Sequence, residues 1–115
     1  MTRDWIDAQV QICNQYKCEF LEADQNSKVG IALSSIGKQP VNGLRHPPTE
    51  NMSGWFIWCG TELSEDPEYF APLHVSHLEE KCPEVLEFLG LPAGYRFLLA
   101  GDYVDVWFDA KLLVI

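Results

Sequence analysis

WFIWCG, at residues 55–60, is the stretch that decides the fold. A short run of tryptophan, phenylalanine and isoleucine between two glycines is typical of a β-strand. Successive side chains of a strand point to opposite faces, so both faces of this one are apolar: Trp55, Ile57 and Cys59 on one, Phe56 and Trp58 on the other. The pattern predicts a central strand covered on both sides, or a strand with one face free to bind a partner.

The chain before this strand predicts one helix, one strand and a loop. Apolar residues recur every three or four positions across residues 4–21, which predicts an amphipathic helix. The segment KVGIALSS, at residues 28–35, predicts a short strand. Residues 36–54 are rich in glycine, proline and asparagine, and they predict a loop of a length that is often functional in a small domain.

The chain after the strand predicts short helical segments and then a hairpin. Helical turns are expected in three places: between Ser64 and Pro72, across residues 73–81, and from Pro83 to Gly90. In the third of these, the buried stripe is expected to consist of Val85, Leu86 and Leu89. Two strands joined around a Gly-Asp turn are expected at residues 95–101 and 103–109.

This order of elements predicts a single compact α+β domain over residues 1–115. We expect a small, mostly antiparallel sheet of about four strands, with an N-terminal helix and a central helical segment packed on it. The chain has 115 residues, of which 47% are hydrophobic. That is enough for one good core and too little for two.

Acidic residues are concentrated in the later half of the chain. The net charge is −9, and residues 62–109 hold eleven acidic side chains against two basic ones, Lys81 and Arg96. Such a surface repels nucleic acid and attracts a basic protein surface. We therefore expect a protein partner with a basic surface and no nucleic acid, although solubility alone also explains an acidic chain.

The sequence contains no transmembrane or secretory signal. No apolar run approaches the length of about 18 residues that a spanning helix needs, and the first residues, MTRDWIDAQV, are polar and acidic. We therefore expect a cytoplasmic protein with no membrane partner. In that compartment the four cysteines are expected to be free, buried thiols rather than two disulfides.

The segment DVWFD, at residues 105–109, is the strongest candidate for partner binding. If it is a strand, Asp105, Trp107 and Asp109 share one face. An aromatic ring between carboxylates suits a partner rich in lysine and arginine, because interface cores favour tryptophan and tyrosine. The alternative is that Trp107 packs under the helical segment of residues 73–89.

Two further segments extend the predicted partner surface. One is an acidic and aromatic cluster, made of Glu65, Asp66, Glu68 and Tyr69. The other is Arg45, which precedes His46 and a Pro-Pro pair that stiffens the chain. Arg45 is therefore either held in a defined place or solvated in a surface loop.

A metal site or a small enzyme is the competing interpretation. His74 and His77 are three residues apart and share a face if the segment is helical, and Cys82 is near in sequence. A zinc site needs three or four ligands, and no second pair of cysteines or histidines completes one. We predict no catalytic residue, no metal and no cofactor. The glutamates around Cys82 are expected to raise the pKa of its thiol, which makes it a poor nucleophile.

Several strings of the later chain resemble a known family. They are GLRHPP, SGWFIWCG, FAPLHVSHL, CPEVLEFLGLPAGYRFL and DVWFD, within residues 43–110. Together they resemble the bacterial immunity proteins of the immunity-thirty-three-like type. The resemblance implies a small cytoplasmic protein that is encoded near a polymorphic toxin and neutralises it by binding. It carries over no catalytic residue, and it does not identify the toxin, its class or the oligomeric state.

Overall fold

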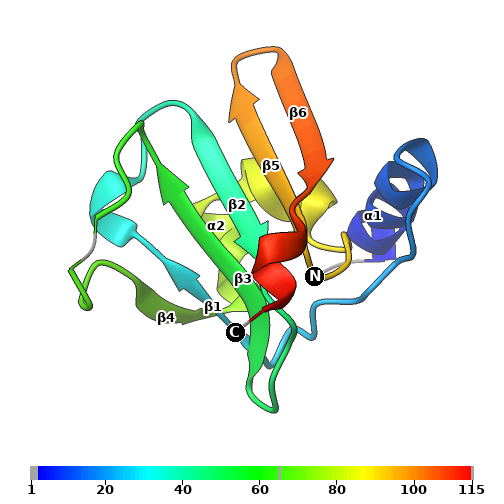
Figure 1. The fold of residues 1–115 in the computed structure, drawn as a ribbon, viewed down its shortest axis with the longest axis horizontal. Helices are drawn as coiled ribbons and strands as arrows, with labels where there is room; N and C mark the ends of the chain where they lie inside the picture. Colours follow the sequence, from blue (N-terminus) through cyan, green and yellow to red (C-terminus); the bar gives the residue numbers. More distant parts are fainter. Residues whose placement is uncertain (1–2, 65, 115) are drawn as a thin grey trace.

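The protein, seen in a computed structural model that describes residues 3–64 and 66–114, contains a six-stranded sheet. The strands lie in the order β4-β1-β3-β2-β5-β6 (Figure 1). β1 and β3 are parallel and the other neighbours are antiparallel. The bounds are β1 Lys28–Ile31, β2 Val41–Arg45, β3 Met52–Cys59, β4 Ala71–His74, β5 Tyr95–Ala100 and β6 Tyr103–Phe108.

The helices are α1 (Arg3–Gln15) and the single turn α2 (Leu78–Lys81), and 3₁₀ segments make the other turns. The longest 3₁₀ segment, Pro83–Phe88, follows α2 directly. The side chain of Gln9 on α1 donates a 2.8 Å hydrogen bond to the carbonyl of Leu86, which fixes α1 against this segment. The remaining 3₁₀ segments are Leu33–Ser35, Val75–His77 and Ala110–Leu113.

The hydrophobic core lies between the helical segments and one face of the sheet. Phe88 of the 3₁₀ segment stacks on Phe97 of β5, with ring centroids 5.2 Å apart. In Figure 1 α2 lies behind the sheet and the C-terminal turn lies in front of it. The core therefore draws on alternate residues of each strand, including Val29, Ile31, Val41, Trp55, Ile57, Phe97 and Leu99.

The α+β class is confirmed, with two strands more than the four expected. The hairpin is confirmed as β5 and β6, and Val85, Leu86 and Leu89 are fully buried as predicted. The expected central place of WFIWCG is also confirmed, because β3 is an internal strand. Its face away from the helices is only partly covered, since Trp58 is buried while Phe56 is half-buried.

The long loop expected at residues 36–54 is wrong, because β2 runs through it between β3 and β5. The strand VNGLR was not predicted because asparagine and glycine, which have low β propensity, lie in its middle. Gly43 is there because the ring of Phe97 lies directly over it. A Cβ atom at residue 43 would lie 2.2 Å from that ring.

The helical boundaries also differ from those predicted. Helix α1 ends at Gln15 instead of residue 21, because Lys17 adopts a left-handed conformation with φ of 57°. The amide of Cys18 then donates to the carbonyl of Cys13 and that of Lys17 to Asn14, which is a Schellman motif without glycine. A helix without a terminal glycine gives little sequence warning of its end.

Three shorter segments are corrected in the same way. The strand predicted over residues 28–35 ends at Ile31, where a 3₁₀ turn follows. The described residues between Ser64 and Pro72 form no helix. Residues 71–74 pair with β1, so the helical stretch predicted from residue 73 begins at Val75.

Candidate partner-binding surface

The sheet face away from the helices, called here the open face, carries two rows of side chains in register across the strands. The first row runs from β6 to β1 and consists of Trp107, Arg96, Leu44, Phe56 and Gly30. The second row consists of Asp105, Leu98, Asn42 and Trp58. Apolar groups therefore occupy the middle of the open face, and polar groups lie towards β6.

An aromatic hollow of about 250 Å³ lies in the middle of the open face. Phe70, from the segment between β3 and β4, forms its wall, with its ring centroid 5.3 Å from that of Phe56 and 6.2 Å from that of Trp58. Leu63 stands at the rim and is 51% exposed. The lining residues are Leu44, His46, Phe56, Trp58, Leu63 and Phe70.

The alternative that Trp107 packs under the helical segment is wrong, because Trp107 lies on the open face and the helices lie on the other. It is half-buried beside Arg96, whose Cζ atom is 5.5 Å from the centre of its ring. Arg96 Nη1 also donates a 3.2 Å bond to Asp109 Oδ2, which forms a partly exposed ion pair. Asp105 is exposed.

The carboxylate of Asp109 also ends β6. It accepts the backbone N–H of Lys111, and this bond lowers the pKa of Asp109 most, with Arg96 lowering it further. Asp109 therefore orders the turn at residues 110–113, which leads the chain across the open face to His46. There His46 Nδ1 lies 3.0 Å from the carbonyl of Leu112.

The acidic and aromatic cluster lies on the other side of the hollow from β6. Asp66 and Glu68 are exposed, whereas Glu65 lies outside the described residues. Tyr69 is half-buried against Phe70, and its hydroxyl donates a 3.3 Å bond to the carbonyl of Glu62. The structure thus places Asp66 and Glu68 on one side of the hollow, and Asp105 and Asp109 on the other (Figure 1). Sequence reasoning missed the hollow, because Leu44 and His46 were assigned to a loop.

Arg45 does not lie on the open face. Its side chain is 1% exposed and points into the core, so the prediction that it contacts a partner is not carried forward. The guanidinium donates only to backbone carbonyls, and burial lowers the pKa of Arg45 to about 10. The acceptors are the carbonyls of Ser53, Leu21, Leu89, Leu91 and Glu22, at 2.7 to 3.4 Å.

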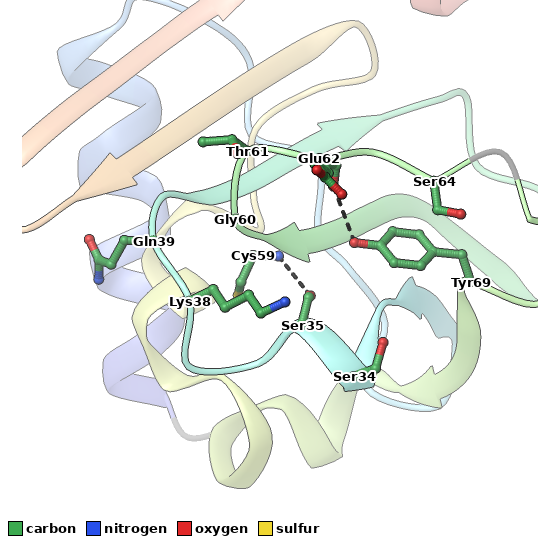
Figure 2. A pocket seen from close by; sticks show the side chains of 10 residues that line it. All are labelled: Ser34, Ser35, Lys38, Gln39, Cys59, Gly60, Thr61, Glu62, Ser64 and Tyr69. Atoms are coloured by element: carbon green, nitrogen blue, oxygen red, sulfur yellow. Dashed lines mark hydrogen bonds between the residues drawn. The ribbon is translucent and has the colours of Figure 1, made fainter.

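A polar hollow of about 620 Å³ lies next to the end of β3 and the Leu33–Ser35 turn (Figure 2). The hydroxyl of Ser35 accepts the N–H of Cys59 at 2.9 Å and donates to the carbonyl of Ala32 at 2.7 Å. Burial raises the pKa of the Cys59 thiol. The Ser35 hydroxyl is therefore hydrogen-bonded as donor and as acceptor, and the Cys59 thiol is held in its protonated form.

A protein-family model described as the Imm33-like domain matches residues 8–109. The chain belongs to the Imm33-like family. The match covers all six strands and most of α1, and so it extends the resemblance over residues 43–110 towards the N-terminus. No curated protein and no solved structure matches the chain significantly.

The geometry of the Imm33-like chain does not assemble the competing metal site. The rings of His74 and His77 are exposed, with centroids 5.8 Å apart, whereas Cys82 is buried. Burial, followed by the charge of Glu84, raises the pKa of Cys82 to about 12. Among the described residues, no three histidine, cysteine or acidic side chains are grouped to hold a metal ion.

All four cysteines of the Imm33-like chain are free thiols, and three of them are buried. Burial raises the pKa of Cys13 to about 12 and also raises the pKa of Cys18. No helix within residues 3–64 and 66–114 is long and apolar enough to cross a membrane.

Proposed function

We propose that this Imm33-like protein is an immunity protein that binds a cognate bacterial toxin and blocks it without chemistry of its own. The observation that carries the proposal is the open face, where an apolar hollow lies between the exposed carboxylates of Asp66 and Glu68 and that of Asp105. α2 and the 3₁₀ segment after it lie on the opposite face of the sheet, whereas the short C-terminal 3₁₀ turn lies on the open face (Figure 1). An apolar surface ringed by polar groups is typical of a protein-binding site.

The charges around the hollow suit a toxin with a basic surface. Asp66 and Glu68 lie on one side and Asp105 on the other, and all three are exposed. Carboxylates at the rim would speed the encounter with lysine and arginine side chains. An apolar side chain of the toxin would enter the hollow and supply most of the affinity, as central anchors do. The proposed partner is therefore a protein, and neither nucleic acid nor a membrane.

The proposal of binding without catalysis is supported by the state of the reactive groups. Cys13 and Cys82 hold their protons far above neutral pH, and the Ser35 hydroxyl is bonded on both sides. The free thiols also fit the cytoplasm, which we propose as the location, because thiols persist there in reduced form.

Co-expression with the toxin encoded next to this gene tests the proposal. We expect the wild-type chain to restore growth of cells that express the toxin and to co-purify with its toxin domain. The decisive control is an equal amount of an unrelated acidic protein of similar size. If the neighbouring toxin still kills cells that express this chain, and does not co-purify with it, the proposed function is wrong.

Substitutions on the open face locate the binding site. We expect Leu63→Arg and Trp107→Ala each to weaken the toxin complex by about 2 kcal/mol or more, as for anchor residues. Leu33→Arg is the matched control, because Leu33 is 43% exposed and lies outside the hollow. Calorimetric titration of folded variants measures the difference. Equal binding by all three variants would place the toxin elsewhere.

A further inference from the structure

The two edges of the sheet differ in how they are protected. β4 is four residues long and contains Pro72, which cannot donate a ladder hydrogen bond. β6 is six residues long, with the sequence YVDVWF, and contains neither proline nor lysine. Natural edge strands are protected by shortness, proline or charged side chains, lysine above all. Of these, β6 has only the carboxylate of Asp105, which repels an acidic strand and attracts a basic one.

Several side chains of β6 are exposed, and no described segment pairs with its outer edge. Tyr103 is 58% exposed, Val104 45% and Phe108 50%. These are large apolar side chains on a strand that, within residues 3–64 and 66–114, pairs with β5 alone. An uncovered apolar edge of this length is a template for a further strand.

The register identifies the free backbone groups of β6. The N–H of Asp109 donates to the carbonyl of Gly94 at 2.7 Å, so Asp109 faces β5. Because residues of an antiparallel strand bond alternately to one side and the other, residues 103, 105 and 107 face β5 as well. The amide and carbonyl groups of Val104, Val106 and Phe108 therefore point away from the sheet.

The side chains of β6 set the pattern that a partner strand needs. Val104, Val106 and Phe108 share the helix side of the sheet, and Val106 packs against the core. Asp105 and Trp107 share the open face. Residues opposite each other in a ladder share a face, so the partner strand would alternate apolar residues with residues that suit carboxylates and an aromatic ring.

We propose that β6 takes up an extended strand of the toxin as a seventh strand, one in which apolar residues alternate with lysine or arginine. The proposal rests on the proposed function, because it names the toxin as the occupant. The new strand would continue the open face beyond β6. Hydrogen bonds of the backbone would supply affinity, and the alternating side chains would supply specificity.

Charge argues for this occupant over a second copy of the chain. Each copy carries a net charge of −9, and Asp102, Asp105 and Asp109 lie on or beside β6. Pairing two β6 strands would bring these carboxylates together, which is unfavourable. A basic strand turns the same carboxylates into an attraction.

A synthetic peptide that alternates valine and lysine, with both ends blocked, tests the edge without the toxin. We expect titration of the isotope-labelled protein to shift and protect the amides of Val104, Val106 and Phe108. A peptide with the same side chains, N-methylated at every amide, is the control, because it keeps the charge and loses the backbone donors of both edges. Equal shifts with both peptides, or none at β6, would overturn the proposal.

Two variants separate the edge from the fold. Val104→Pro removes an outward N–H and no bond to β5, so the variant is expected to fold and to bind the peptide about tenfold more weakly or worse, a loss of about 1.4 kcal/mol. Val104→Thr is its matched control, since it keeps the N–H and the branched shape. Asp105→Lys is expected to lower affinity for the lysine peptide and raise it for one that alternates valine and glutamate. Wild-type binding by Val104→Pro would refute strand addition.

The toxin domain and light scattering complete the test. In the toxin complex, hydrogen exchange is expected to slow at the same three amides; a complex without that protection refutes strand addition and leaves the proposed function standing. Absence of any complex refutes the proposed function, while the peptide still decides whether the edge accepts a strand. A dimer of the chain alone that Val104→Pro makes monomeric would show that a second copy is the occupant.

Discussion

At the scale of single residues, Arg45 is a buried cation held by carbonyls of several segments. It is 1% exposed, and its guanidinium lies 5.5 Å from the ring centre of Trp55. Its carbonyl acceptors come from three separate parts of the chain: residues 21–22, 53 and 89–91. Because Trp55 Nε1 also donates to the carbonyl of Leu89, the two side chains together hold the segment after the 3₁₀ helix against the sheet.

Arg45→Lys is expected to destabilise the protein by about 2–4 kcal/mol, because three ammonium donors cannot replace the fork of five and buried carbonyls lose their partners. Denaturant unfolding measures the change. Arg96→Lys is the matched control, since its ion pair with Asp109 is partly exposed and is expected to contribute about 1 kcal/mol or less. Equal stability of the two variants would show that the carbonyl bonds of Arg45 contribute little.

At the scale of elements, β2 joins the two halves of the sheet. It lies between β3 and β5, and without it the hairpin would have no link to the parallel pair of β1 and β3. Gly43 makes this possible, because only a residue without a Cβ atom lets the ring of Phe97 lie over the strand. The close approach of the Phe97 ring to the backbone at Gly43 involves β5 and β2, which are far apart in sequence, so no single segment of the sequence predicts it.

Gly43→Ala is expected to destabilise the protein by about 1–3 kcal/mol through overpacking. Thermal and denaturant unfolding measure the loss. The double variant Gly43→Ala with Phe97→Leu tests the cause, since the shorter side chain makes room for the added methyl group. The two changes are expected to be less harmful together than the sum of the single ones. Additive losses would show that the ring is not what excludes a side chain at residue 43.

At the scale of the whole molecule, burial holds several groups in their neutral form. Desolvation raises the pKa of Cys13 and Cys82 to about 12, and it also raises the pKa of Cys18, Cys59 and Tyr95. In the unfolded chain the cysteines ionise near 9.0. Unfolding above that pH therefore releases protons that the folded state retains, and alkaline solution favours the unfolded chain.

Stability is expected to be constant with respect to these groups below pH about 9 and to fall as pH rises towards about 12. The lowered pKa of Arg45 has the opposite effect on the free energy of unfolding above about pH 10, but it is one group against the four cysteines and Tyr95. Urea midpoints measured across this range test the expectation, and Cys82→Ala is expected to flatten the curve. A midpoint that stays constant between the two pH values would contradict it.

The sequence predicted the elements whose signals are local and missed those that depend on distant partners. The hairpin was predicted from the alternation of apolar and polar residues around a Gly-Asp turn. The helical segment after Pro83 was predicted from its apolar stripe. The strand VNGLR has poor intrinsic β propensity and exists because β3 and β5 pair with it. α1 ends at a lysine that adopts a left-handed conformation, which composition does not reveal.

The candidate surface was predicted in part for the same reason. Trp107 and the acids around it stood out in a short string, and the structure puts that tryptophan on the open face. The hollow is assembled from β2, β3 and the segment before β4, so no single string contains it. Arg45 was predicted as a partner-binding residue or as a residue held in a defined place, and the structure holds it in the core. The sequence could not show which way its side chain points, because one step along a strand exchanges the faces.

Along β2, side chains that stabilise the fold alternate with side chains that face the open face. Arg45 helps to hold the fold together, while its neighbour Leu44 opens onto the hollow. Under the proposed function, substitution of Leu44 would change the contact with a toxin while the carbonyl bonds of Arg45 stay in place. An immunity protein built in this way would be able to change its specificity through residues of the open face, while the residues that hold the fold stay the same.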